Sequence, residues 1–273
     1  MLGADDSPVI LHVPHASQVI PSDARARLLL GDEALTAELA HMTDAHTDVI
    51  AEGAAAAAGR TPWSLVNLLS RLVVDPERFP DEREDMRAVG MGAVYTRTSH
   101  GQLLRSVDDA AVEEALLARW YRPYGQAMTD LVDARLAATG RVTVLDVHSY
   151  PSRRLPYERG GELRPAACLG THPDHTPDWL LDAGREAFAS CGSVAVNTPF
   201  AGCYVPLKHF GKEPRVSALM VEIRRDLYLV EPGGQPTKGM AAVTASLTRL
   251  IDAATFALDA ERRSAWITKR LCN

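Results

Sequence analysis

Three side chains able to take part in catalysis occur near the ends of predicted β-strands, far apart in the 273-residue chain. His15 follows the run "VILHVP", His148 follows "VTVLDV", and Glu222 lies in "SALMVEI". Two imidazoles and a carboxylate suit a catalytic zinc site, which takes three protein ligands and leaves one position for water. A further carboxylate beside the metal can act as general base and then as proton donor. Glu222 is the best candidate for that role, because an acid inside an apolar strand is unlikely to serve packing alone.

Each of these residues also has a purely structural interpretation. His148 could cap its strand, His15 could bond to a turn carbonyl, and Glu222 could pair with a buried arginine. A serine-hydrolase mechanism based on Ser149 beside His148 is excluded, because adjacent strand residues point to opposite faces. The G-x-S-x-G elbow of such enzymes is also missing from the sequence.

The elements that must position these side chains follow from the hydrophobic pattern. The pattern predicts strands at 8–14, 63–69, 71–75, 141–149, 167–171, 193–197 and 216–223. It predicts helices at 21–30, 32–58, 106–139 (broken near Pro123), 176–190 and 238–258. Residues 76–106 and 150–166 have no clear period and are expected to be loops, and a loop as long as 76–106 is usually functional or mobile.

Strands that alternate with helices, several of them apolar on both faces, favour an α/β fold. We expect one domain over residues 1–273, with three layers: a mainly parallel or mixed central sheet and helices on both faces. Ligands bind at the carboxyl ends of the strands in such sheets. The polar residues that follow the strands should therefore meet in one place: His15, Asp75, Arg78, His148, Glu222 and Arg224.

Composition excludes several classes of function. Apolar residues make up 46% and charged residues 23% of the chain, which is typical of a globular protein. The formal net charge of -6 argues against nucleic acid or an anionic membrane as a partner. No apolar run reaches the roughly 18 residues that span a bilayer. The four cysteines form no CxxC pair, and the N-terminal apolar run is interrupted by His12, so we expect a reduced, cytoplasmic protein without a signal peptide.

Two segments, "VLDVHSYPSRRLPY" and "ALMVEIRRDLYLVEPG", resemble the metallocarboxypeptidase superfamily. The chain is more similar still to the N-formylglutamate amidohydrolase family. The shared blocks run in order from residue 9 to residue 228: "VPHAS", "TDAHTD", "SRLVVDPER", "DVHSYP", "GCYVPLKHFG" and "ALMVEIRRDLY". The resemblance implies a zinc-carboxypeptidase-like (phosphorylase/hydrolase-like) fold and the hydrolysis of N-formyl-L-glutamate to glutamate and formate, a reaction of histidine degradation.

The resemblance also implies roles for individual residues. His15 and His148 become ligands of one Zn²⁺, or another divalent transition metal, per chain, and Glu222 becomes the general base and acid. Metallocarboxypeptidases take a Glu three residues after the first His, but position 18 is Gln here, and an amide is a poor zinc ligand. We expect Asp44 of "TDAHTD" to be the third ligand, with His46 and then Asp48 as alternatives.

Asp146 and His148 are two residues apart and share a strand face. Asp146 is therefore expected to orient a metal ligand rather than to bind the metal.

A substrate with carboxylates requires fixed cations, and arginine captures a carboxylate with two parallel hydrogen bonds. We expect substrate contacts from Arg71, Arg78, Arg224, Tyr204 and His209. The family usually shows Asp-Leu-Asn-Arg where this chain has Asp75-Pro76-Glu77-Arg78. Glu77 could repel a substrate carboxylate.

Two other functions remain open for this small-molecule site. The same zinc site could serve a deacylase or carboxypeptidase-like hydrolase acting on another N-acyl amino acid or peptide. Alternatively, Gln18 and Glu77 could mark a non-catalytic member of the fold that binds an acidic ligand.

Overall fold

A six-stranded mixed sheet forms the centre of the protein, in the strand order β2-β1-β3-β6-β4-β5. The computed structural model describes residues 2–106, 110–158 and 163–271, with side chains through residue 256. The strands are β1 (Val9–Val13), β2 (Trp63–Val66), β3 (Val142–Tyr150), β4 (Ala167–Gly170), β5 (Val194–Val196) and β6 (Val216–Arg224). Only the pairing of β4 with β6 is antiparallel among these strand pairs. The predicted mainly parallel, mixed sheet is confirmed.

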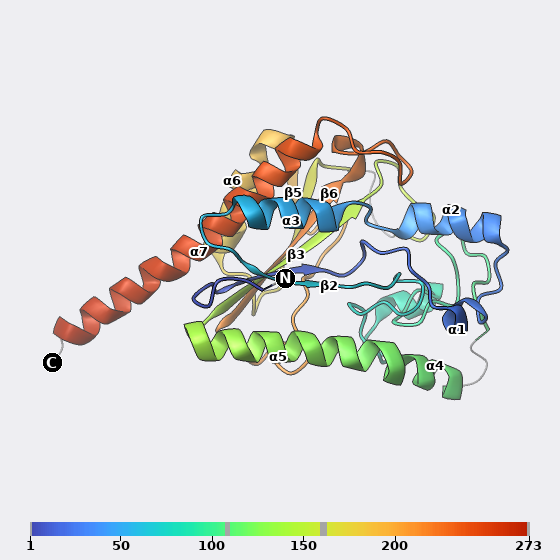
Figure 1. Cartoon of the computed structure of the whole chain (residues 1–273), viewed down its shortest axis with the longest axis horizontal. Helices are drawn as coiled ribbons and strands as arrows, with labels where there is room; N and C mark the ends of the chain where they lie inside the picture. The colour runs from blue at the N-terminus through green and yellow to red at the C-terminus, as the bar shows by residue number, and fades with distance from the viewer. Residues whose placement is uncertain (1, 107–109, 159–162, 272–273) are drawn as a thin grey trace.

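Helices cover both faces of the sheet (Figure 1). One face packs against α3 (Thr47–Ala57), α6 (Asp178–Phe188) and α7 (Met240–Leu271), and the other against α5 (Arg122–Thr139). The remaining helices are α1 (Ser22–Arg25), α2 (Asp32–Met42), α4 (Ala110–Leu116), a π-helical turn at Leu117–Tyr121, and 3-10 turns at Asp85–Val89, Ala189–Cys191 and Arg225–Leu227. The three predicted layers are therefore present.

The two faces of the sheet are buried in different apolar clusters because strand side chains alternate. Leu145 and Leu219 pack towards α3, α6 and α7, whereas Val144 and Ala218 pack towards α5. All four side chains are fully buried. The continuous apolar runs in β3 and β6 thus reflect burial on both sides.

The predicted helix at 32–58 is in fact two helices, α2 and α3, separated by residues 43–46. Thr43 has an extended backbone, and His46 adopts a left-handed conformation with φ of 66°. The amide of Asp44 donates a 3.0 Å hydrogen bond to the carbonyl of His15 rather than to a carbonyl of its own helix. The interruption therefore ties Asp44 to the end of β1.

The predicted strand at 71–75 is wrong, because these residues form a turn. The amide of Val73 donates to the carbonyl of Ser70 at 2.9 Å, and that of Leu72 donates to the Ser70 hydroxyl at 3.2 Å. Leu72 and Val74 are buried in two different apolar clusters outside the sheet. Their apolar character serves packing of a turn rather than strand pairing.

Other predicted boundaries also shift. The short helix at 21–30 shrinks to α1, and the helix at 106–139 is interrupted by the π-helical turn just before Pro123. Residues 107–109 lie outside the described residues, as does Cys272. The described cysteines, Cys168, Cys191 and Cys203, are free thiols. No helix in the described ranges is long and apolar enough to cross a membrane.

Removing a central side chain tests this packing. Leu145 is fully buried in β3, so Leu145→Ala should lower the free energy of unfolding by about 2–5 kcal/mol, measured by urea denaturation. The matched control is Leu68→Ala, because Leu68 is 75% exposed and its loss should change stability by less than about 0.5 kcal/mol. Equal losses for the two variants would contradict the assignment of the core.

Candidate active site

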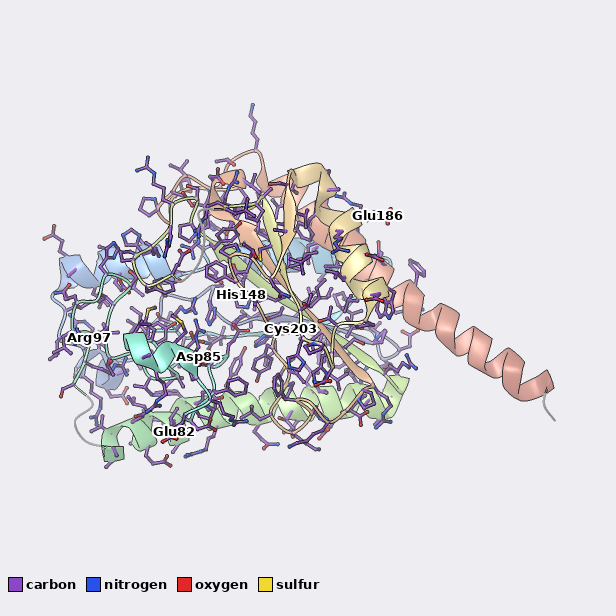
Figure 2. The ribbon with its side chains drawn as sticks, turned by 180° about the vertical axis from the view of Figure 1, so that it is seen from behind. Glu82, Asp85, Arg97, His148, Glu186 and Cys203 are labelled. Atoms are coloured by element: carbon purple, nitrogen blue, oxygen red, sulfur yellow. The ribbon has the colours of Figure 1, made fainter. Side chains whose placement is uncertain are left out.

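The carboxyl ends of β1, β3 and β6 open onto a cavity of about 730 Å³. His15, Asp44, His148 and Glu222 all line this cavity, although they come from four separate segments of the chain. Figure 2 shows His148 near the middle of the molecule, with Asp85 and Arg97 of the 76–106 segment to one side and Glu186 of α6 to the other. The strand-end residues selected from the sequence thus largely meet in one place.

The register of the sheet determines which of these side chains are neighbours. The parallel pairing of β3 with β6 sets His148 directly beside Glu222. The pairing of β1 with β3 sets His12 beside Asp146 in the same way. Since Asp146 and His148 are two residues apart, their side chains share one face of β3, as predicted.

Three donor atoms form a compact triangle at the mouth of the sheet. Nδ1 of His15 lies 3.2 Å from Nδ1 of His148, and Oδ2 of Asp44 lies 3.0 Å from His148 Nδ1 and 3.6 Å from His15 Nδ1. Zinc binds nitrogen and oxygen at about 2.0–2.2 Å in tetrahedral sites, which places ligand atoms about 3.3 Å apart. These three atoms could therefore hold a zinc ion and leave a fourth position open.

The other nitrogen of each imidazole, Nε2, lies beside a buried carboxylate. Nε2 of His15 donates to Asp75 at 2.9 Å, and Nε2 of His148 lies 3.0 Å from Oδ1 of Asp146. Metal-binding histidines almost always donate their other nitrogen in this manner, which fixes the ring and its tautomer. Asp146 lies beside His148 as Asp75 lies beside His15, and the role of Asp146 in orienting a ligand stays a prediction.

Asp44 is fixed in turn by a buried guanidinium. Arg225 donates from Nη2 to Oδ1 of Asp44 at 2.9 Å and from Nη1 to the carbonyl of His41 at 2.6 Å. The other oxygen of Asp44, Oδ2, remains directed at the two histidines. Arg225 thus selects which carboxylate oxygen faces the candidate metal position.

Glu77 provides a second possible ligand in the same cavity. Single donor atoms of His15, Glu77 and His148 all lie within 4.8 Å of one another, and His12, Glu77 and Asp146 form a similar group. Glu77 lies 3.9 Å from Nδ1 of His15 and makes a 3.1 Å hydrogen bond with Nε2 of His148, a nitrogen that also lies 3.0 Å from Asp146. The set with Asp44 is more compact and uses Nδ1 of both histidines, so it fits a metal better.

The alternatives from the sequence lie elsewhere. His46 makes a 3.0 Å hydrogen bond between its Nε2 and the carbonyl of Gly234, and the Asp48 side chain is exposed and accepts a bond from the amide of Val49. Gln18 is also exposed. None of these three lines the cavity.

Charges around the histidines favour a cation. Burial alone would raise the pKa of Asp44, but hydrogen bonds from His148 and His15 and the charge of Arg225 hold that pKa well below its usual range. Burial lowers the pKa of His148, but the charges of Glu77 and Asp146 outweigh it and raise that pKa well above its ordinary value. Ionised carboxylates therefore surround both imidazoles, and a divalent ion would displace the imidazole protons on binding.

Glu222 has the properties of a proton-transfer group. Its side chain is 9% exposed, and within the described chain its Oε2 is a buried oxygen with no hydrogen-bond partner. Burial raises the pKa of this carboxyl to about 7, against the opposing charge of His148. A carboxyl with such a pKa can both take up and release a proton near neutral pH.

The expected substrate-binding residues divide into two groups. Arg71, Arg78 and Tyr204 line the cavity. Arg224 and His209 do not belong to the cavity lining found over the described residues: Arg224 donates to Asp226 at 2.7 Å, and His209 makes a 2.9 Å hydrogen bond with Asp133. Substrate contacts by Arg224 and His209 stay predictions without support from the cavity lining.

Two residues of the site were not selected from the sequence. The strand β6 ends at Arg224, and the following 3-10 turn rotates Arg225 rather than Arg224 into the cavity. His12 is fully buried, with Nδ1 2.8 Å from Asp146 and Nε2 2.7 Å from the hydroxyl of Tyr124. Only the adjacent arginines at 224–225 gave a sequence signal, and it did not distinguish between them.

Comparisons with known proteins place the chain in a family and support its fold. A family model described as N-formylglutamate amidohydrolase matches residues 7–229. The crystal structure of N-formylglutamate amidohydrolase from Ralstonia eutropha JMP134 is similar with a TM-score of 0.73 and 22% identity, covering 96% of each chain. A gene product from Agrobacterium tumefaciens is similar with a TM-score of 0.71 and 20% identity, covering 94% of this chain and 95% of the other. These two structures share the fold. The comparison with curated proteins found no match.

Substitution of the two carboxylates distinguishes the two ligand sets. Asp44→Asn should reduce zinc affinity by more than about 100-fold. Losing a residue that only orients a ligand reduces metal affinity by roughly 10- to 100-fold, and losing a ligand itself should have a larger effect. Glu77→Gln should retain close to one zinc per chain. Zinc content after dialysis and competition with a chelating dye measure both. The opposite pattern, with zinc lost from Glu77→Gln and kept by Asp44→Asn, would assign the ligand role to Glu77.

Proposed function

The chain belongs to the N-formylglutamate amidohydrolase family, and on that premise we propose that it is a zinc-dependent hydrolase of the amide bond in an N-acyl amino acid. N-formyl-L-glutamate, cleaved to glutamate and formate, is the substrate that the family name indicates. The observation that carries the proposal is the triangle of His15, His148 and Asp44 beside the unpartnered oxygen of Glu222.

The metal would be held by His15, His148 and Asp44. When bound, zinc would polarise the amide carbonyl and make water acidic enough to lose a proton near neutral pH. Asp75, Asp146 and Arg225 are the groups that keep the three ligands in place. Their support matters because a small displacement of a ligand weakens both binding and chemistry.

Glu222 would transfer the proton. Its Oε2 accepts a proton from the attacking water as the oxygen of that water bonds to the acyl carbon. The same carboxyl then delivers this proton to the amide nitrogen as the carbon–nitrogen bond breaks. The products are a carboxylic acid and a free amine, and Glu222 returns to its starting state.

A substrate carboxylate would bind at Arg78. This side chain lines the cavity, and its contacts to carboxylates of the described residues are long, 3.5 Å to Glu84 and 3.7 Å to Asp75. Arg71 is more firmly engaged, with a 2.7 Å contact to Asp75 and a 3.0 Å hydrogen bond to the hydroxyl of Tyr95. Arg78 is therefore the better candidate for a direct contact.

Glu222→Gln tests the proposed proton transfer. The amide cannot accept a proton, so kcat should fall by about 10²- to 10⁴-fold, while zinc content and the thermal unfolding midpoint remain close to wild type. The control is Glu186→Gln on α6, outside the cavity, which should keep normal turnover. Turnover by Glu222→Gln within a factor of about three of wild type would rule out the proposed role.

Removal of the metal tests the cofactor independently. Dialysis against a strong chelator should abolish hydrolysis, and one equivalent of Zn²⁺ should restore it, because three of the donor groups lie at zinc-ligand separations. Full activity in protein with less than about 5% zinc or other divalent metal would contradict the proposed cofactor.

A further inference from the structure

The cavity is larger than N-formyl-L-glutamate requires. Its volume is about 730 Å³. A water molecule takes about 30 Å³ in the liquid, so even at that volume for each of its roughly 12 non-hydrogen atoms, formylglutamate would fill about 360 Å³. Pockets of about 300–1,000 Å³ typically enclose drug-sized ligands. The space is suited to a substrate with an additional bulky group.

Aromatic side chains form much of the wall of this space. They come from separate segments and include Phe79, Tyr121, Tyr157, Phe200, Tyr204 and Phe210. Phe79 and Phe210 pack edge to face with ring centroids 5.5 Å apart, which joins the 76–106 segment to the segment that follows β5. Such a wall would contact an apolar group of the substrate, and the removal of that group from water would favour binding.

Few of the cations in the cavity are available for a substrate carboxylate. Among the described arginines and lysines that line it, four have carboxylate contacts of 2.9 Å or less: Arg71 with Asp75 (2.7 Å), Arg122 with Glu114 (2.6 Å), Lys208 with Asp133 (2.5 Å) and Arg225 with Asp44 (2.9 Å). Arg78 has the long contacts given above, the shorter of them 3.5 Å. Arg78 is therefore the cation of this group that is least engaged with protein carboxylates, and it marks one binding position for a substrate carboxylate.

A negative charge opposes a second carboxylate. Glu77 lines the cavity with 16% of its side chain exposed, and its carboxylate lies 3.1 Å from His148, beside the candidate metal position. A substrate carboxylate near Glu77 would meet like charge in a partly buried site, where such repulsion is poorly screened.

From these four features we propose that the preferred substrate is an N-acyl amino acid with one carboxylate and a bulky apolar group. N-formyl-L-glutamate, with two carboxylates and no apolar group, fits less well. Arg78 binds the single carboxylate, the aromatic wall receives the apolar group, and Glu77 excludes a second carboxylate. This inference rests on the proposed amide hydrolysis.

A substrate panel with the zinc-loaded enzyme tests the inference. N-formyl-L-glutamate is compared with N-formyl-L-phenylalanine, which shares the formyl group, and with N-benzoyl-L-alanine, which carries the bulk on the acyl side. At least one of the two apolar substrates should have a kcat/KM at least tenfold higher than that of N-formyl-L-glutamate. The highest kcat/KM for N-formyl-L-glutamate would overturn the substrate class and leave amide hydrolysis intact. Hydrolysis of none of the three would overturn both.

Variants test the contributions of the charge and of the aromatic wall. Glu77→Gln should shift the ratio of kcat/KM values towards N-formyl-L-glutamate by at least tenfold, and an unchanged ratio would remove Glu77 from the explanation.

Phe79→Ala should raise KM for the preferred apolar substrate at least fivefold. The matched control, Phe256→Ala, removes a phenylalanine that is 61% exposed on α7, and its KM should equal that of wild type. Equal KM values for the two Phe variants would contradict binding at the aromatic wall.

Discussion

Buried carboxylates determine how the side chains of this site are oriented. Asp44, Asp75 and Asp146 are 0–1% exposed, and an unpaired charge at such positions would destabilise the fold by several kcal/mol. Each is therefore bonded to an imidazole or a guanidinium. Asp75 bonds to Nε2 of His15, and Nε2 of His148 lies 3.0 Å from Asp146 and 3.1 Å from Glu77, so that both rings present Nδ1 to the same point. The requirement to pair buried charge thus produces a set of donor atoms aimed at one position.

The sheet brings these pairs together through its register. Nine residue pairs align β3 with β6, and one of them is His148 with Glu222. A slip of one residue would turn every side chain of a strand to the opposite face. The apolar side chains of β3 and β6 are buried in different clusters on the two faces, so such a slip would also bury polar groups in both. The packing that stabilises the sheet therefore also maintains the distance between the candidate metal ligands and the proton-transfer group.

Sequence patterns predicted the features that depend on local hydrophobicity. The strands that carry His15, His148 and Glu222 have apolar runs that require burial on both faces, and the resemblance to the amidohydrolases led to Asp44. Tertiary contacts determined what the patterns missed. The carbonyl of His15 binds the amide of Asp44 and interrupts an Ala-rich segment in which the pattern predicted a continuous helix. No single stretch of sequence predicts the register that buries His12 against Asp146. The same is true of the turn that directs Arg225 inward.

The position of the metal is the central claim, and anomalous diffraction at the zinc edge from crystals of the zinc-loaded protein tests it most directly. We expect one anomalous peak per chain, about 2.0–2.2 Å from Nδ1 of His15, Nδ1 of His148 and Oδ2 of Asp44. A peak bonded to Glu77 and to Nε2 of His148 would contradict this account, as would the lack of any peak in the cavity.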